Sequence, residues 1–233
     1  MSIDNYRAVL LDIEGTTTPI SFVHQVLFPY SRTHLESFLK QHSNSADVQL
    51  DLERLQQEHS ADAVSGQQPP ALIEQYVYWL IDHDRKSPAL KSLQGKIWEE
   101  GYKDGSLCSI VFPDVPRAIE RWHDLGISLN IFSSGSVLAQ KLLFAHTDAG
   151  DLTSFIDKYF DTSAGKKNEV GSYETISAAI ATRPNEICFV SDVVAELDAA
   201  AEAGMKTYLS IRPGNPEQKL GISHPSIRTF DEL

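Results

Sequence analysis

Short apolar runs that end abruptly in polar residues recur along the chain, and they predict the strands of a parallel sheet. The first run, 8–11, is followed by two acids, a glycine and three threonines. A run of this length suits a strand buried on both faces. Four further runs predict strands at 127–132, near 159–160, at 186–190 and at 206–209. Helical patterns separate these runs, so we expect an α/β protein built from β-α-β units.

Residues 20–108 have a different texture, with apolar residues at helical spacing and no strand pattern. Ile73, Tyr76, Val77 and Leu80, for example, follow the i, i+3, i+4, i+7 pattern of an amphipathic helix. We therefore predict a core domain formed by 1–19 and 109–233, and an all-helical cap formed by 20–108. The cap would be inserted after the first strand, where it can act as a lid over the strand ends.

The segment 211–226 is rich in proline and glycine, which predicts an irregular surface loop. Aromatic residues within the helical block are candidates to contact an apolar part of a substrate, although a place in the helical core explains them equally well. These candidates are Phe22, Phe28, Tyr76 and Trp79.

Composition and charge exclude some partners. The net charge of −12 would repel nucleic acid and acidic membranes, so we expect neither as a partner. It does not exclude an anionic substrate, because local cations can reverse the potential inside one cleft.

Cys108 and Cys188 are too few and too far apart for a disulfide framework or a zinc site. With no signal peptide and no membrane-length apolar run, we expect a cytoplasmic protein, and a monomer.

Acidic residues follow two of the predicted strands. Asp12 and Glu14 come after the first strand, and Asp192 comes after the strand 186–190. Ligands of open α/β sheets collect at the carboxyl ends of strands. If these strands are neighbours, Asp12 and Asp192 can hold Mg²⁺, which prefers carboxylate oxygens, phosphate and water. Glu196 is a candidate to hold a metal-bound water; for Asp12 and Glu14, an acidic turn with capping threonines is the alternative.

Two further stretches favour an anionic ligand. Ser133 and Ser134 lie between a predicted strand and helix, where hydroxyls and free backbone N–H groups bind phosphate, although helix capping also explains serines there. Lys166 or Lys167 can neutralise a phosphoryl oxygen in a cleft. Together with Mg²⁺, these groups would let Asp12 attack a phosphate ester and form an aspartyl-phosphate.

This ordered set resembles the haloacid-dehalogenase superfamily of aspartyl-phosphate phosphatases. Most of these enzymes carry aspartate where Glu14 stands. The run 11–23, LDIEGTTTPISFV, resembles more narrowly the acireductone synthases, which are the enolase-phosphatases of methionine salvage. The run 131–144, IFSSGSVLAQKLLF, is also similar to that family.

The resemblance implies a haloacid-dehalogenase-like Rossmannoid core and one Mg²⁺ per subunit. It implies enolisation and then dephosphorylation of a phosphorylated diketone, 2,3-diketo-5-methylthiopentyl-1-phosphate, to 1,2-dihydroxy-3-keto-5-methylthiopentene. It assigns Mg²⁺ to Asp12, the carbonyl of Glu14 and Asp192, substrate to Ser133 and Ser134, and phosphate to Lys167 rather than Lys166.

The position of Glu14 beside Asp12 suggests the hypothesis that Glu14 is the base or proton shuttle of enolisation. Other interpretations remain. One is a phosphoglycolate-type phosphatase, and another is a dehalogenase, which would have no use for an acid at Asp192. A third is a non-enzymatic phosphate-sensing module on the same fold, since fold alone does not fix function.

Overall fold

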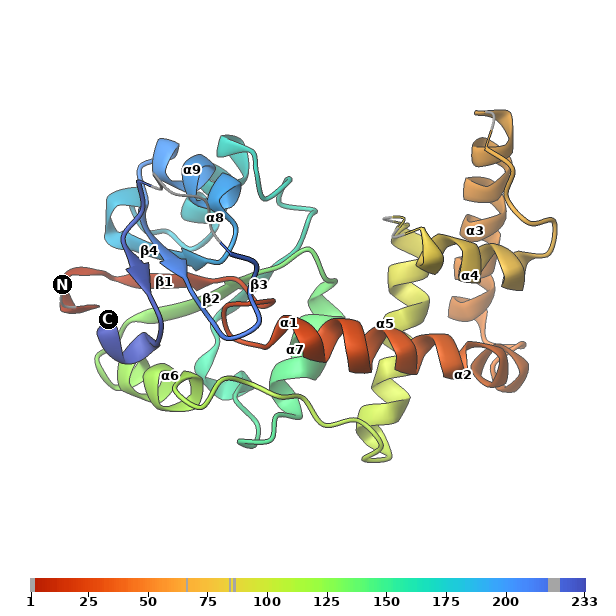
Figure 1. Ribbon diagram of the computed structural model, residues 1–233, viewed down its shortest axis with the longest axis horizontal. Helices are drawn as coiled ribbons and strands as arrows, with labels where there is room; N and C mark the ends of the chain where they lie inside the picture. The colour runs from red at the N-terminus through yellow and green to blue at the C-terminus, as the bar shows by residue number, and fades with distance from the viewer. Residues whose placement is uncertain (1–2, 66, 84, 86, 218–222) are drawn as a thin grey trace. The chain divides into compact units, whose positions relative to one another are not determined.

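The computed structural model describes residues 3–65, 67–83, 85, 87–217 and 223–233, and the chain divides into two compact units (Figure 1). The larger unit consists of Met1–Val23 and Cys108–Leu233, and the second is His24–Leu107. These divisions fall within a few residues of the predicted boundaries at 19 and 109. That the helical unit serves as a cap stays a prediction.

The larger unit contains a six-stranded sheet in the order β3-β2-β1-β4-β5-β6, and every strand pair is parallel. This confirms the predicted α/β fold class. The strands are β1 (Ala8–Leu11), β2 (Ser128–Phe132), β3 (Lys158–Phe160), β4 (Ile187–Ser191), β5 (Lys206–Ser210) and β6 (Ser226–Ile227). The first strand in sequence is therefore a central one, hydrogen-bonded to β2 on one side and to β4 on the other.

Helices cover both faces of this sheet. They are α6 (Val115–Asp124), α7 (Val137–Ala145), α8 (Val170–Ala179) and α9 (Val194–Glu202). Val9 and Leu11 of β1 pack into a core shared with α6 and α7, whereas Ala8 and Leu10 pack into a core shared with α8 and α9. Figure 1 shows α6 on one side of the sheet and α8 and α9 on the other. Successive residues of a strand point to opposite faces, so a strand buried on both faces must be apolar throughout.

Short elements complete the described chain. These are η1 (Ile3–Asn5), α1 (Ile20–Phe22), the π-helical turn η2 (Val23–Leu27), η3 (Thr153–Phe155), η4 (Pro184–Glu186) and η5 (Phe230–Glu232).

The described part of the second unit contains the helices α2 (Phe28–Gln41), α3 (Ala46–Val64), α4 (Ile73–Asp82) and α5 (Pro88–Lys103), joined by turns and loops. Helix α5 begins with Pro88 after Ser87, whose Oγ accepts a hydrogen bond from Leu90 N–H at 2.9 Å. A serine cap followed by proline is a favourable helix start. Tyr76 is fully buried in this unit's apolar core, so helical packing explains it. Phe22, in the larger unit, is also buried.

The predicted surface loop 211–226 is partly wrong. Arg212 is only 5% exposed, and Ser226 begins the edge strand β6. The prediction failed because two residues are too short to give a strand pattern, and because the partners of Arg212 lie far away in sequence. Residues 218–222 of the predicted loop lie outside the described residues.

Within the described ranges, no helix has the length and apolarity needed to span a membrane. Cys108 and Cys188 are both free thiols. Cys188 is fully buried in β4, and this burial raises the pKa of its thiol. It acts as a small core residue.

Candidate active site

Asp12 and Asp192 are brought together by the pairing of β1 with β4. Leu11 lies opposite Val190 in the register, and Asp12 N–H donates to the Val190 carbonyl at 3.0 Å. The two aspartates therefore leave adjacent strands at the same edge of the sheet. Both side chains are buried, with residue exposures of 4% for Asp12 and 8% for Asp192. The predicted Mg²⁺ site required the strands before Asp12 and Asp192 to be neighbours, and β1 and β4 are neighbours.

Lys167 reaches this pair of strand ends from the segment before α8. Its Nζ lies 2.5 Å from Asp12 Oδ1 and 2.6 Å from Glu196 Oε2. Burial alone would lower the pKa of Lys167, but the carboxylates of Asp12 and Glu196 outweigh it and raise that pKa, so the side chain stays charged. The side chain of Lys166, by contrast, is 78% exposed and pairs with Glu169 at 3.1 Å. Of the two lysines that the residue pattern offered, Lys167 therefore lies beside Asp12 and Lys166 does not.

Glu196 lies in the first turn of α9 and contacts Lys167 directly. Ser191 Oγ donates to Glu196 Oε2 at 2.8 Å, and it also lies 3.4 Å from Asp12 Oδ2. Burial and the charge of Asp12 raise the pKa of Glu196. That Glu196 holds a metal-bound water stays a prediction; the structure places its carboxylate in an ion pair with Lys167.

Three acidic groups gathered around one ammonium leave an excess of negative charge. Burial, and then the charges of Asp12 and Glu196, raise the pKa of Asp192 to about 7. An additional cation beside Asp192 would remove this repulsion. No set of three or more His, Cys, Asp or Glu side chains forms a metal cage among the described residues. A cation here would need main-chain, water or substrate oxygens as well, and that mixed oxygen set suits Mg²⁺.

The loop Asp12–Thr18 turns sharply at Gly15, beside the carboxylate of Asp192. Gly15 has φ +68°, and Gly15 N–H donates to the Thr18 carbonyl at 2.8 Å. A Cβ at Gly15 would come within 2.5 Å of Asp192 Oδ2, so the Asp192 carboxylate lies directly against this glycine. Glu14, half-buried, pairs with Thr18 in an isolated β-bridge. Only glycine meets both the backbone angle and the close approach of the carboxylate.

Ser133 and Ser134 occupy the turn between β2 and α7, at the same edge of the sheet as Asp12. Ser133 Oγ accepts from Gly135 N–H at 3.1 Å, and Ser136 Oγ caps α7 by accepting from Ala139 N–H at 3.3 Å. The helix start therefore has its own capping serine, Ser136, and Ser133 and Ser134 lie before it. This arrangement suits an anion-binding turn at a helix N-terminus.

Gln140, which no sequence pattern singled out, holds this turn in place. Its Nε2 donates to the carbonyls of Gly135 and Phe160, each at 2.9 Å, and Gln140 is 1% exposed. Ser133 N–H also donates to the Phe160 carbonyl at 3.1 Å. The turn after β2 is thereby tied to the end of β3.

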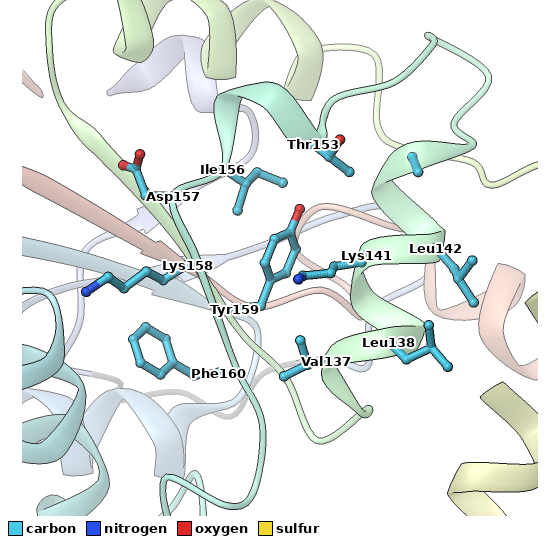
Figure 2. A pocket seen from close by; sticks show the side chains of 11 residues that line it. Val137, Leu138, Lys141, Leu142, Thr153, Ile156, Asp157, Lys158, Tyr159 and Phe160 are labelled. Carbon is cyan, nitrogen blue, oxygen red and sulfur yellow. The ribbon is translucent and has the colours of Figure 1, made fainter. Parts of the chain in front are cut away.

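A groove of about 660 Å³ runs between α7, η3 and β3 in the larger unit. Figure 2 shows its side chains, with Lys141 of α7 beside the ring of Tyr159 of β3, and its Nζ is 5.7 Å from the ring centroid. Asp12, Lys167 and Asp192 are not among the residues that line it. This groove is therefore separate from the carboxylate cluster.

Comparison with known proteins identifies the class of this fold and site. A family model of haloacid dehalogenase-like hydrolases matches residues 6–204. Among curated relatives, enolase-phosphatase E1 of Synechococcus elongatus is 48% identical over 97% of this chain and 96% of its own length. That of Sorangium cellulosum is 46% identical, with 97% of each chain covered. The chain belongs to the haloacid dehalogenase-like hydrolases and, within them, to the enolase-phosphatase E1 family.

Solved structures agree with this placement. The UTR4 protein of Saccharomyces cerevisiae matches with a TM-score of 0.81 and 36% identity, covering 98% of this chain and 100% of the other. CbbY of Rhodobacter sphaeroides, crystallised with phosphate, has a TM-score of 0.62 at 18% identity, covering 98% of this chain and 96% of CbbY. The second likeness supports the fold alone. The resemblance stated from the sequence is therefore confirmed at the level of the family.

Proposed function

We propose that the chain is a Mg²⁺-dependent enolase-phosphatase of methionine salvage. It converts 2,3-diketo-5-methylthiopentyl-1-phosphate into the acireductone 1,2-dihydroxy-3-keto-5-methylthiopentene and phosphate. The observation that carries this proposal is the near full-length match to relatives named enolase-phosphatase E1, at 43–48% identity. The buried Asp12–Lys167–Glu196 cluster supports the phosphatase half independently, because it supplies a carboxylate nucleophile and a fixed cation.

In the phosphatase step, Asp12 is the nucleophile. An oxygen of its carboxylate attacks phosphorus, the bond from phosphorus to the enol oxygen breaks, and that oxygen leaves with the electron pair and takes a proton. Water then hydrolyses the aspartyl-phosphate, which returns the carboxylate and releases phosphate. Lys167 lies where it can neutralise a phosphoryl oxygen, and its pairing with Glu196 fixes its position. Ser133 and Ser134 bind the phosphate-bearing end of the substrate.

In the enolisation step, a proton leaves the carbon that bears the phosphate ester, and an enol forms. We propose Glu14 as the base or the proton shuttle, because it follows Asp12 in the same loop and is half-buried. One Mg²⁺ per subunit would be held by Asp12, Asp192 and the carbonyl of Glu14. When bound, it supplies positive charge to the phosphoryl oxygens and to the developing enolate. A monomeric, cytoplasmic enzyme stays a prediction.

The test is to follow enol formation by ultraviolet absorbance, and phosphate release, from the diketo phosphate ester with Mg²⁺ or EDTA. We expect an enol signal followed by phosphate release with Mg²⁺, and no phosphate release from Asp12→Asn. A panel of simple phosphate esters and 2-haloacids run alongside separates the alternatives. Turnover of phosphoglycolate or haloacids without turnover of the diketone would refute the salvage assignment, and no turnover of any compound would favour a non-enzymatic role.

A further inference from the structure

The end of β5 and the segment after it hold the loop Asp12–Thr18 through main-chain carbonyls. Ser210 Oγ donates to the Gly15 carbonyl at 3.1 Å, and Asn215 Nδ2 donates to the same carbonyl at 2.9 Å. Arg212 Nε donates to the next carbonyl, that of Thr16, at 3.1 Å. We call Ser210, Arg212 and Asn215 the loop clamp. It lies entirely within the larger unit, and two of its three residues come from the stretch that the sequence pattern predicted to be a surface loop.

The clamp acts on the peptide unit next to the proposed metal ligand. Gly15 N–H donates to Thr18, and in a trans peptide the carbonyl of the preceding residue points the opposite way. The Glu14 carbonyl is thereby directed away from Thr18. On the other side of Gly15, the clamp binds the Gly15 carbonyl. The peptide before Gly15 and the peptide after it are therefore both held by hydrogen bonds, and this fixes the direction of the Glu14 carbonyl.

Asn215 also meets Asp192 at this glycine. A Cβ on Gly15 would lie 2.9 Å from Asn215 Oδ1 and 2.5 Å from Asp192 Oδ2, so both side chains pack against the Cα of Gly15. Asn215 Oδ1 is buried and has no hydrogen-bond partner among the described residues. A buried amide oxygen without a partner costs free energy unless another group binds it. Asn215 therefore lies beside the Asp192 carboxylate and is hydrogen-bonded to the loop at the same time.

Arg212 gives the clamp a rigid base. Its guanidinium binds Asp114 through two bonds of 2.8 and 2.9 Å and donates to the Arg228 carbonyl at 2.8 Å. It also lies over the rings of Phe112 and Phe230, at 4.7 and 4.6 Å from their centroids. A planar guanidinium with this many fixed partners has little freedom to move.

We propose that Asn215 and Arg212, with Ser210, are positioning residues that hold the loop so that the Glu14 carbonyl and Asp12 keep their directions toward the proposed Mg²⁺. This inference rests on the proposed function, because it takes the Glu14 carbonyl as a metal ligand. Each clamp residue donates one hydrogen bond to the loop, and none of the hydrogen bonds described for these three residues goes to the phosphate-binding turn or to Lys167. Its loss should therefore weaken metal binding and lower kcat, and leave KM for substrate nearly unchanged.

The test compares Asn215→Ala with Asn130→Ala. Asn130 is a matched control because its Nδ2 also donates to main-chain carbonyls, those of Val9 and Ser128, but it lies in β2 rather than beside the loop. For each protein, the melting temperature is titrated with Mg²⁺ alone, and kcat and KM are measured at saturating Mg²⁺. We expect Asn215→Ala to raise the half-saturating Mg²⁺ concentration about tenfold or more, as loss of a partner that orients a ligand commonly does. Asn130→Ala should lower the melting temperature without changing the Mg²⁺ midpoint.

A second pair of variants guards against misfolding. Ser210→Ala removes one donor to the Gly15 carbonyl and should shift the Mg²⁺ midpoint in the same direction but less. Arg212→Lys keeps the positive charge but loses the planar guanidinium that binds Asp114 and the Thr16 carbonyl together, so it should also raise the Mg²⁺ midpoint. An Asn215→Ala protein with unchanged midpoint and kcat, or an equal shift in Asn130→Ala, would overturn the inference alone. A wild-type protein whose melting temperature and activity ignore Mg²⁺ would overturn the proposed metal site and this inference with it.

Discussion

The ammonium of Lys167 lies 2.5 Å from Oδ1 of Asp12, across 155 residues of sequence, and both side chains are largely buried. A buried ion pair of this kind loses much when one partner is removed, because the other charge is left without compensation. In the proposed mechanism the pair has a chemical use as well. A dianionic phosphate can approach a carboxylate only where positive charge already stands beside it.

Replacing Lys167 by methionine should therefore lower kcat/KM for phosphate release by about 100-fold or more, the scale of losing one group that stabilises transition-state charge. Lys166→Met is the control, because that lysine is exposed and pairs with Glu169 rather than with Asp12. It should keep kcat/KM within about twofold of the wild type, as surface changes do. Steady-state phosphate release measures both. Equal losses would mean that the proposed role belongs to neither lysine alone.

Glu14→Gln should separate the two half-reactions. If Glu14 is the base of enolisation, the rate of enol appearance should fall by about 100-fold or more, the contribution of a positioned general base. Hydrolysis of an aryl phosphate, which needs no enolisation, should change far less. Stopped-flow absorbance and a phosphate assay give the two rates. A variant that enolises at full rate would assign the base to another residue.

Gly15→Ala should remove activity for two reasons. The backbone at Gly15 has φ +68°, and the new Cβ would meet Asp192 Oδ2 at 2.5 Å. Gly126 offers a matched control, since its φ is +71° and no atom lies within 4 Å of the position that a Cβ would take. Gly126→Ala should cost about 1–2 kcal/mol of unfolding free energy from the left-handed backbone alone and keep its activity. Equal activity in the two variants would show that the contact with Asp192 does not matter.

Removing Mg²⁺ should lower thermal stability as well as activity. Asp12 and Asp192 are buried side by side, and a bound cation would offset their repulsion. At a Mg²⁺ concentration about 100 times its dissociation constant, we expect a melting temperature about 5 to 10 °C above that in EDTA. Differential scanning fluorimetry measures the shift. Asp192→Asn should lose most of it, and a full shift in that variant would place the cation elsewhere.

The Asp114–Arg212 ion pair should behave as a coupled unit in stability measurements. Arg212→Met alone should cost about 3–5 kcal/mol of unfolding free energy, because Asp114 stays buried without its cation. Adding Asp114→Leu should cost less than the sum of the single changes, with a coupling on the order of 1–3 kcal/mol. Urea unfolding of the four proteins gives the cycle. Strict additivity would show that the pair does not act as a unit.

The sequence was informative where chemistry follows a strand. Buried parallel strands leave an apolar run that stops at a visible place, so the positions of Asp12 and Asp192 at one edge of the sheet were predictable. The choice between Lys166 and Lys167 was not decidable from spacing, because both lie in an irregular segment whose side-chain directions no period describes. The family resemblance favoured Lys167, which is the lysine that lies beside Asp12, whereas Lys166 is exposed; the phosphate-binding role of Lys167 stays a prediction.

The supporting residues were missed for a different reason. Gln140 was not singled out, and Glu196 was named only as a candidate to hold water and not as a partner of Lys167, because the partners of both side chains are set by tertiary packing. Arg212 lies in a stretch rich in proline and glycine, and its partner Asp114 is 98 residues away. A local pattern cannot report a contact of that range.

The central place of β1 has a consequence for synthesis of the protein. Val9 pairs with Leu129 on one side and with Cys188 on the other, so the strand that leads into Asp12 leaves the ribosome long before either neighbour. The whole of His24–Leu107 is made in that interval and can fold around its own core first. Pairings of such long range form late and slowly. The nascent chain therefore carries an unpaired apolar strand through most of translation, and the proposed site around Asp12 is assembled among the last parts of the protein.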